Sequence, residues 1–94
     1  MRIQAQVSIY PLKTESLAQP VEMFCRELRT PGLTVTTQSM STLIVGESDG
    51  VFEAVRQAFA ALATEYDVVM DLKVSNACPD AAETRHKKKV NDRQ

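Results

Sequence analysis

The sequence predicts one small α+β domain, because segments of two different periodicities follow one another along its 94 residues. Residues 3–10, 33–38, 41–46 and 67–75 alternate in polarity or are rich in β-branched side chains, as strands are. The two longer segments between them repeat apolar residues at helical spacing. The order strand, helix, strand, strand, helix, strand is typical of the ferredoxin-like βαββαβ fold. In that fold a four-stranded antiparallel sheet carries both helices on one face.

The first predicted strand, Ile3–Tyr10, shows the clearest alternation, with one apolar and one polar face. The polar face bears two amides, a hydroxyl and a phenol, and no charge. Such a face suits a second sheet or a bound small molecule, or it is simply exposed to solvent. Pro11 has no N–H to donate, so we predict that the strand ends there. The two faces consist of Ile3, Ala5, Val7 and Ile9, and of Gln4, Gln6, Ser8 and Tyr10.

The first predicted helix begins near Ser16, which with Gln19 three residues later fits a capping box. Pro20 is tolerated because it falls in the first turn. Residues 30–32, Thr-Pro-Gly, end the helix. Its apolar stripe consists of Leu17, Val21, Phe24, Cys25 and Leu28.

The second and third strands, 33–38 and 41–46, are joined by the short connection 39–40, which predicts an antiparallel hairpin. Two registers are compatible with the sequence. A clean two-residue loop places Val35 and Ile44 on one face, whereas one extra residue or a bulge aligns Val35 with Leu43 and Val45.

The second predicted helix starts in the turn 47–50, with Ser48 or Asp49 as its cap, and runs to about Glu65. We expect its apolar stripe, including both phenylalanines, to lie in the core. The last strand is 67–75, and the chain turns polar from Pro79. We therefore predict a domain over 1–78 and a polar tail over 79–94. The stripe consists of Val51, Phe52, Val55, Ala58, Phe59, Leu62 and Tyr66.

Composition argues against several classes of function. Eleven basic and twelve acidic side chains leave a net charge of −1, which gives no reason to expect nucleic acid or a membrane surface as partner. Cys25 and Cys78 lie far apart in the sequence and have no metal-ligand spacing, so we expect neither a disulfide nor a metal site. This use of cysteine favours a reducing, cytoplasmic setting. We also expect no cofactor. The first strand leaves no room for a signal peptide. The one histidine, His86, lies in the tail, and we expect no enzymatic activity.

The stretches QVSIYPL (6–12) and QSMSTLIVG (38–46), together with the length of the chain, resemble the small thiamine-binding, YkoF-like family. The resemblance extends from Ile3 to about Val74. It implies a ferredoxin-like domain that pairs into homodimers or homotetramers. It also implies binding of thiamine or its hydroxymethylpyrimidine half, without chemistry. One departure is the end of the last strand, where 74–78 replaces the charged Asp-Arg ending typical of the family.

The expected topology brings the end of the first strand beside the starts of the third and fourth, and beside the end of the second. We therefore expect a ligand-binding rim there, with hydroxyl and amide groups for pyrimidine nitrogens, an aromatic face, and a carboxylate for the thiazolium charge. Several of these residues also have a simpler role. Ser8 could hydrogen-bond across a subunit interface, Tyr10 could pack on Pro11, and Asp71 could lie in solvent or pair with Lys73. Met40, nearby, could cover a ligand ring or fill a gap at an interface. Whether Thr42 belongs to the rim depends on the hairpin register. The rim consists of Ser8, Tyr10, Gln38, Thr42 and Asp71.

One rival interpretation remains open at this stage. An oligomeric regulatory or structural domain of the same fold, similar to ACT domains, would bind another small molecule or none. A ligand screen with thiamine, its pyrimidine half and amino acids separates the two.

Overall fold

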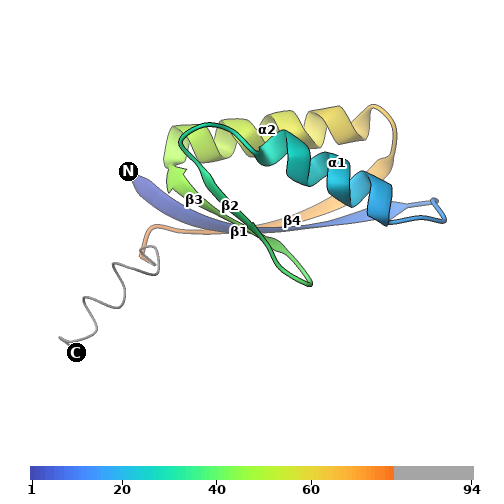
Figure 1. Ribbon diagram of the computed structural model, residues 1–94, viewed down its shortest axis with the longest axis horizontal. Helices are drawn as coiled ribbons and strands as arrows, with labels where there is room; N and C mark the ends of the chain where they lie inside the picture. The colour runs from blue at the N-terminus through green and yellow to red at the C-terminus, as the bar shows by residue number, and fades with distance from the viewer. Residues whose placement is uncertain (78–94) are drawn as a thin grey trace.

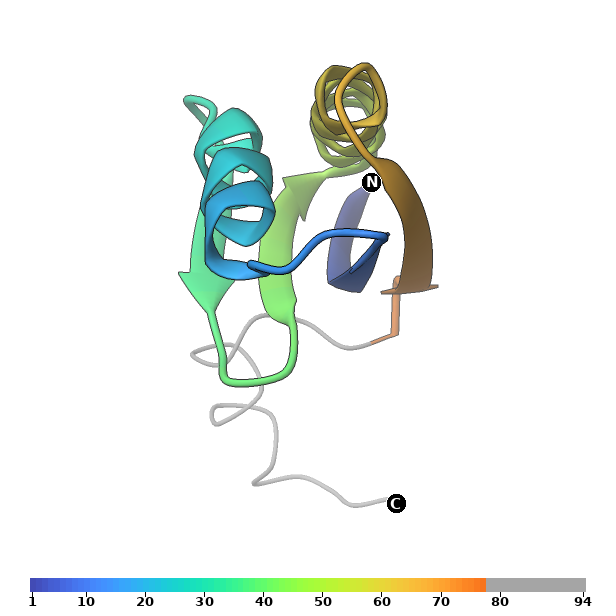
Figure 2. The same cartoon turned by 90° about the vertical axis from the view of Figure 1, so that its right-hand side faces the viewer.

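Four antiparallel strands form one sheet in the order β2-β3-β1-β4, and both helices lie on one side of it (Figures 1 and 2). The computed structural model describes residues 1–77 and confirms the ferredoxin-like βαββαβ fold. The predicted tail, 79–94, lies outside the described residues. The elements are β1 (Arg2–Leu12), α1 (Ala18–Leu28), β2 (Thr34–Thr37), β3 (Thr42–Glu47), α2 (Ser48–Ala63) and β4 (Asp67–Ser75).

Strand β1 is central, pairing with β3 along one edge and with β4 along the other. Its predicted alternation is confirmed, since Ile3, Ala5 and Val7 are buried under the helices. The predicted end at Pro11 is wrong, because Pro11 pairs with Val68 and the strand continues. Pairing with β3 stops at Val7, so beyond it one edge of β1 has no neighbour. A residue without an N–H is tolerated there.

The β2–β3 hairpin adopts the first of the two predicted registers. Val35 pairs with Ile44, and the backbone N–H of Gln38 donates to the carbonyl of Ser41 at 2.8 Å. Residues 39 and 40 are therefore a two-residue loop. This register decides which side chains of β3 face the helices and which face away.

The core fills the space between the sheet and the two helices. The sheet contributes apolar residues of β1 and β3, and each helix contributes its inward stripe. No helix among residues 1–77 is long and apolar enough to cross a membrane. The buried cluster consists of Ile3, Ala5, Val7, Phe24, Leu28, Ile44, Val51, Ala54, Val55, Ala58 and Leu62.

Neither predicted helix cap is formed. Helix α1 begins two residues after Ser16, and its N-cap, Leu17, makes no side-chain cap hydrogen bond. Pro20 does fall in the first turn, and the N–H of Val21 donates to the carbonyl of Leu17 at 3.2 Å. Helix α2 begins at Ser48, inside the predicted start 47–50, but neither Ser48 nor Asp49 makes a side-chain cap hydrogen bond.

Four apolar residues predicted in the helical stripes lie outside the core. Val21 and Phe59 are only partly buried and do not belong to the buried cluster, and Leu17 and Phe52 are exposed. Leu17 is 56% exposed because α1 starts only after it. Phe52 is 49% exposed, whereas its neighbour Val51 is fully buried. Adjacent helical positions point about 100° apart, so only one of the two faces the sheet.

Candidate functional site

The face of the sheet turned away from the helices, here called the open face, carries a polar surface. On this face, residues of β1 stand opposite residues of β4, as the register shows. Along β1 they alternate with the residues that are buried under the helices. On the other side of β1, Leu43 of β3 stands opposite Gln6. The β1–β4 pairs on the open face are Gln4–Ser75, Gln6–Lys73, Ser8–Asp71 and Tyr10–Val69.

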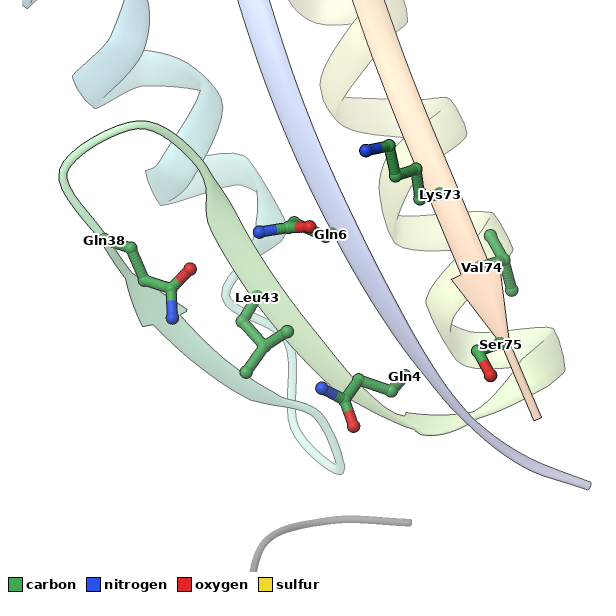
Figure 3. A pocket seen from close by; sticks show the side chains of 7 residues that line it. All are labelled: Gln4, Gln6, Gln38, Leu43, Lys73, Val74 and Ser75. Carbon is green, nitrogen blue, oxygen red and sulfur yellow. The ribbon is translucent and has the colours of Figure 1, made fainter. Parts of the chain in front are cut away.

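A first hollow of about 320 Å³ lies across β3, β1 and β4 on the open face (Figure 3). Three side-chain amides surround the apolar side chain of Leu43, and Lys73 closes the far side. Amides both donate and accept hydrogen bonds, so this surface suits a flat heterocycle that carries both kinds of group. The lining residues are Gln4, Gln6, Gln38, Leu43, Lys73, Val74 and Ser75.

A second hollow of about 220 Å³ adjoins the first, and Gln6 and Lys73 line both. It differs in chemistry, because it adds an aromatic ring, a thioether and a carboxylate. Tyr10 is 52% exposed and Met40 85% exposed, so both present apolar surface to solvent. The lining residues are Gln6, Ser8, Tyr10, Met40, Ser41, Asp71 and Lys73.

A chain of hydrogen bonds fixes the hairpin loop to β1 beside the hollows. Gln6 Nε2 donates to Ser41 Oγ at 3.0 Å, and Ser41 Oγ donates to Gln38 Oε1 at 3.1 Å. Ser8 Oγ donates to the carbonyl of Met40 at 3.1 Å. Within residues 1–77 these bonds leave Gln6 Oε1 and Gln38 Nε2 without a partner, one an acceptor and the other a donor.

The structure brings most of the predicted rim together. Ser8, Tyr10 and Asp71 line the second hollow, and Gln38 lines the first. Thr42 does not join them. It pairs with Val7 on the helix side of the sheet, is 6% exposed, and has its Oγ1 3.5 Å from Cys25 Sγ. The two-residue loop puts Ser41, and not Thr42, on the open face.

The predicted rim did not include five residues that line the two hollows, namely Gln4, Gln6, Met40, Ser41 and Lys73. Gln4, Gln6 and Lys73 were recoverable from period two alone, because each lies on the same face as a predicted rim residue of its own strand. Among residues 1–77 no group of three or more His, Cys, Asp or Glu side chains could hold a metal ion.

The fold and the hollowed face together define a small ferredoxin-like domain with space for a ligand on its open sheet. A family model described as thiamine-binding protein matches residues 5–93. The chain belongs to this family. The comparison with curated proteins gave no match.

Solved structures with the same fold come from archaea and bacteria. A Methanocaldococcus jannascii protein is 24% identical, with a TM-score of 0.79, covering 95% of this chain and 98% of that one. A candidate thiamine biosynthesis/salvage protein from Thermotoga maritima is 15% identical, with a TM-score of 0.75 and coverage of 96% and 100%. A domain of unknown function from Bacillus cereus is 18% identical, with a TM-score of 0.74 and coverage of 97% and 92%. At these identities the likeness concerns the fold.

Proposed function

We propose that the protein binds thiamine, or its hydroxymethylpyrimidine half, on the open face and releases it unchanged. Membership of the thiamine-binding family supports the ligand. The observation that carries the proposal is the pair of adjoining hollows, whose linings differ as the two rings of thiamine differ. The Thermotoga maritima neighbour, a candidate thiamine biosynthesis/salvage protein, has the same fold.

The neutral aminopyrimidine fits the first hollow. Its ring nitrogens accept hydrogen bonds and its exocyclic amine donates them, which matches the donors and acceptors of Gln4, Gln6 and Gln38. Leu43 supplies an apolar surface for the ring.

The cationic thiazolium fits the second hollow. Tyr10 offers an aromatic face to a cation, and Asp71 offers a carboxylate. Ser8 stands opposite Asp71 and donates a hydrogen bond to the carbonyl of Met40. It therefore fixes the position of the loop that forms one wall of this hollow. Thr42 has no part in this site, because it lies on the helix side of the sheet.

Replacing Asp71 with asparagine tests the role of charge while keeping the shape of the side chain. The carboxylate is exposed, so we expect thiamine affinity to fall about two- to fivefold and affinity for the neutral pyrimidine to change little. The loss should shrink as salt is added. Titration calorimetry with both ligands measures it, and chromatography afterwards should return thiamine intact.

Asp67→Asn is the matched control for Asp71→Asn. Asp67 is a carboxylate on the same strand, but it lines neither hollow and its Oδ2 lies 3.4 Å from Lys13 Nζ. Its replacement should leave thiamine affinity unchanged. Equal losses for the charged and neutral ligands in Asp71→Asn would contradict the assigned role of this carboxylate. Binding of an amino acid in place of thiamine would point to a regulatory domain.

We also propose that a second copy of the chain covers the open face, in a homodimer or homotetramer. Tyr10 and Val69 pair across β1 and β4 and are each about half exposed. Together with Met40, which is 85% exposed, they form an apolar border of the open face that is exposed to solvent in a monomer. Cys25 is buried and free, which agrees with a reducing, cytoplasmic setting.

Gln6→Lys should weaken this assembly. The new cation would stand directly opposite Lys73 and would break the bond to Ser41, so two like charges would repel each other at the interface. We expect the dimer dissociation constant to rise at least about tenfold, as measured by sedimentation velocity. Gln19→Lys adds the same charge at an exposed site in α1 and should change nothing. A wild-type protein that sediments as a monomer at micromolar concentration would contradict the proposal.

A further inference from the structure

Lys73 has a position that thiamine itself does not explain. It is exposed and lines both hollows, and Figure 3 shows its side chain reaching from β4 towards β1. It stands opposite Gln6, at the boundary where the two hollows meet. A ligand that fills both hollows therefore has to pass this ammonium group.

Two charged side chains on this face, Asp71 and Lys73, have no ion-pair partner among residues 1–77. By contrast, Asp67 on the same strand is paired with Lys13. A purely cationic ligand would be attracted by Asp71 and repelled by Lys73. A ligand carrying both charges would be attracted by both.

The spacing of the two charges limits the ligand further. Asp71 and Lys73 are two residues apart on one strand, so their side chains leave the sheet about 6.6 Å apart on the same face. In a phosphate ester of thiamine, a two-carbon chain and an ester oxygen separate the thiazolium ring from the phosphate. That link spans a similar distance.

Resting on the proposed function, we propose that the site selects a phosphorylated, zwitterionic ligand, thiamine monophosphate over thiamine, with Lys73 binding the phosphate. Lysine is a mobile point charge that binds phosphate without demanding a fixed orientation. The thiazolium then lies against Tyr10 and Asp71, and the flexible two-carbon chain of the ester folds back along β4, so that the phosphate meets the mobile Lys73 ammonium group. Lys73 is thus a specificity-determining residue, and Asp71 binds the opposite end of the same charge pair.

Calorimetry on the full-length protein with thiamine, thiamine monophosphate and inorganic phosphate tests the assignment. Wild type should bind the monophosphate about three- to 30-fold more tightly than thiamine, and inorganic phosphate should compete with neither at millimolar concentration. In Lys73→Gln the preference should vanish, because the ammonium group that binds the phosphate is gone. Lys13→Gln, an exposed lysine that lines neither hollow, should keep the full preference.

The outcomes separate this inference from the proposed function. Equal wild-type affinities for thiamine and its monophosphate, or a preference that survives in Lys73→Gln, would overturn the role of Lys73 and leave thiamine binding intact. Competition by inorganic phosphate as strong as that of the ester would overturn it too, since the site would then be a plain anion site. Binding of neither thiamine nor its ester by wild type would overturn both proposals.

Discussion

Phe24→Ala is expected to lower the free energy of unfolding by about 3–5 kcal/mol, since the ring is 2% exposed and its loss leaves a cavity. Domains of this size are stable by only about 5–10 kcal/mol, so the variant should be close to unfolding at room temperature. Urea unfolding followed by circular dichroism measures the change. Protein concentration must be held constant, because assembly adds to apparent stability.

Phe52→Ala is the matched control, because it removes the same side chain from the outer face of α2. At 49% exposure Phe52 should contribute about 1 kcal/mol or less. Phe24→Leu provides a milder core change if the alanine variant does not fold. Equal destabilisation by Phe24→Ala and Phe52→Ala would contradict the assigned core.

Tyr10→Leu is expected to weaken thiamine binding about three- to 30-fold, because it replaces the aromatic face of the second hollow with an aliphatic one. Tyr10→Phe keeps the ring and should bind thiamine as wild type does. Calorimetry on the two variants separates the ring from the hydroxyl. Unchanged binding in Tyr10→Leu would remove the ring from the site, and equal losses in both variants would assign the role to the hydroxyl.

The fold was predictable because period two and period 3.6 are direct consequences of backbone geometry. Strand β4 has the predicted bounds, and β1 has the predicted buried face. The error at Pro11 had a different origin. Whether a strand tolerates proline depends on which edge is unpaired, and that depends on where the neighbouring strand ends.

The helix details were less predictable for a similar reason. A capping pattern at Ser16 is a local preference, and the helix instead starts at Ala18. Phe52 fits the same apolar stripe as Val51, and only the position of α2 over the sheet decides which of the two is buried.

The part of the site that follows from the order of the strands alone was predictable. Antiparallel order brings Ser8, Tyr10 and Asp71 together, and the structure confirms that they line one hollow. The face on which Thr42 lies depends on the hairpin register, and the sequence was compatible with two registers. Lys73 was missed because it was considered only as a partner for Asp71, although its strand position places it in both hollows.

The central claim, that thiamine binds on the open face, is tested most directly by titrating thiamine into uniformly ¹⁵N-labelled protein and following amide chemical shifts. We predict saturable shifts at residues 4–10, 38–43 and 69–75, which border the two hollows. Residues 52–60 of α2 should not move, since that helix lies on the other side of the sheet. No saturable shift at all, or shifts confined to the helices, would contradict the account.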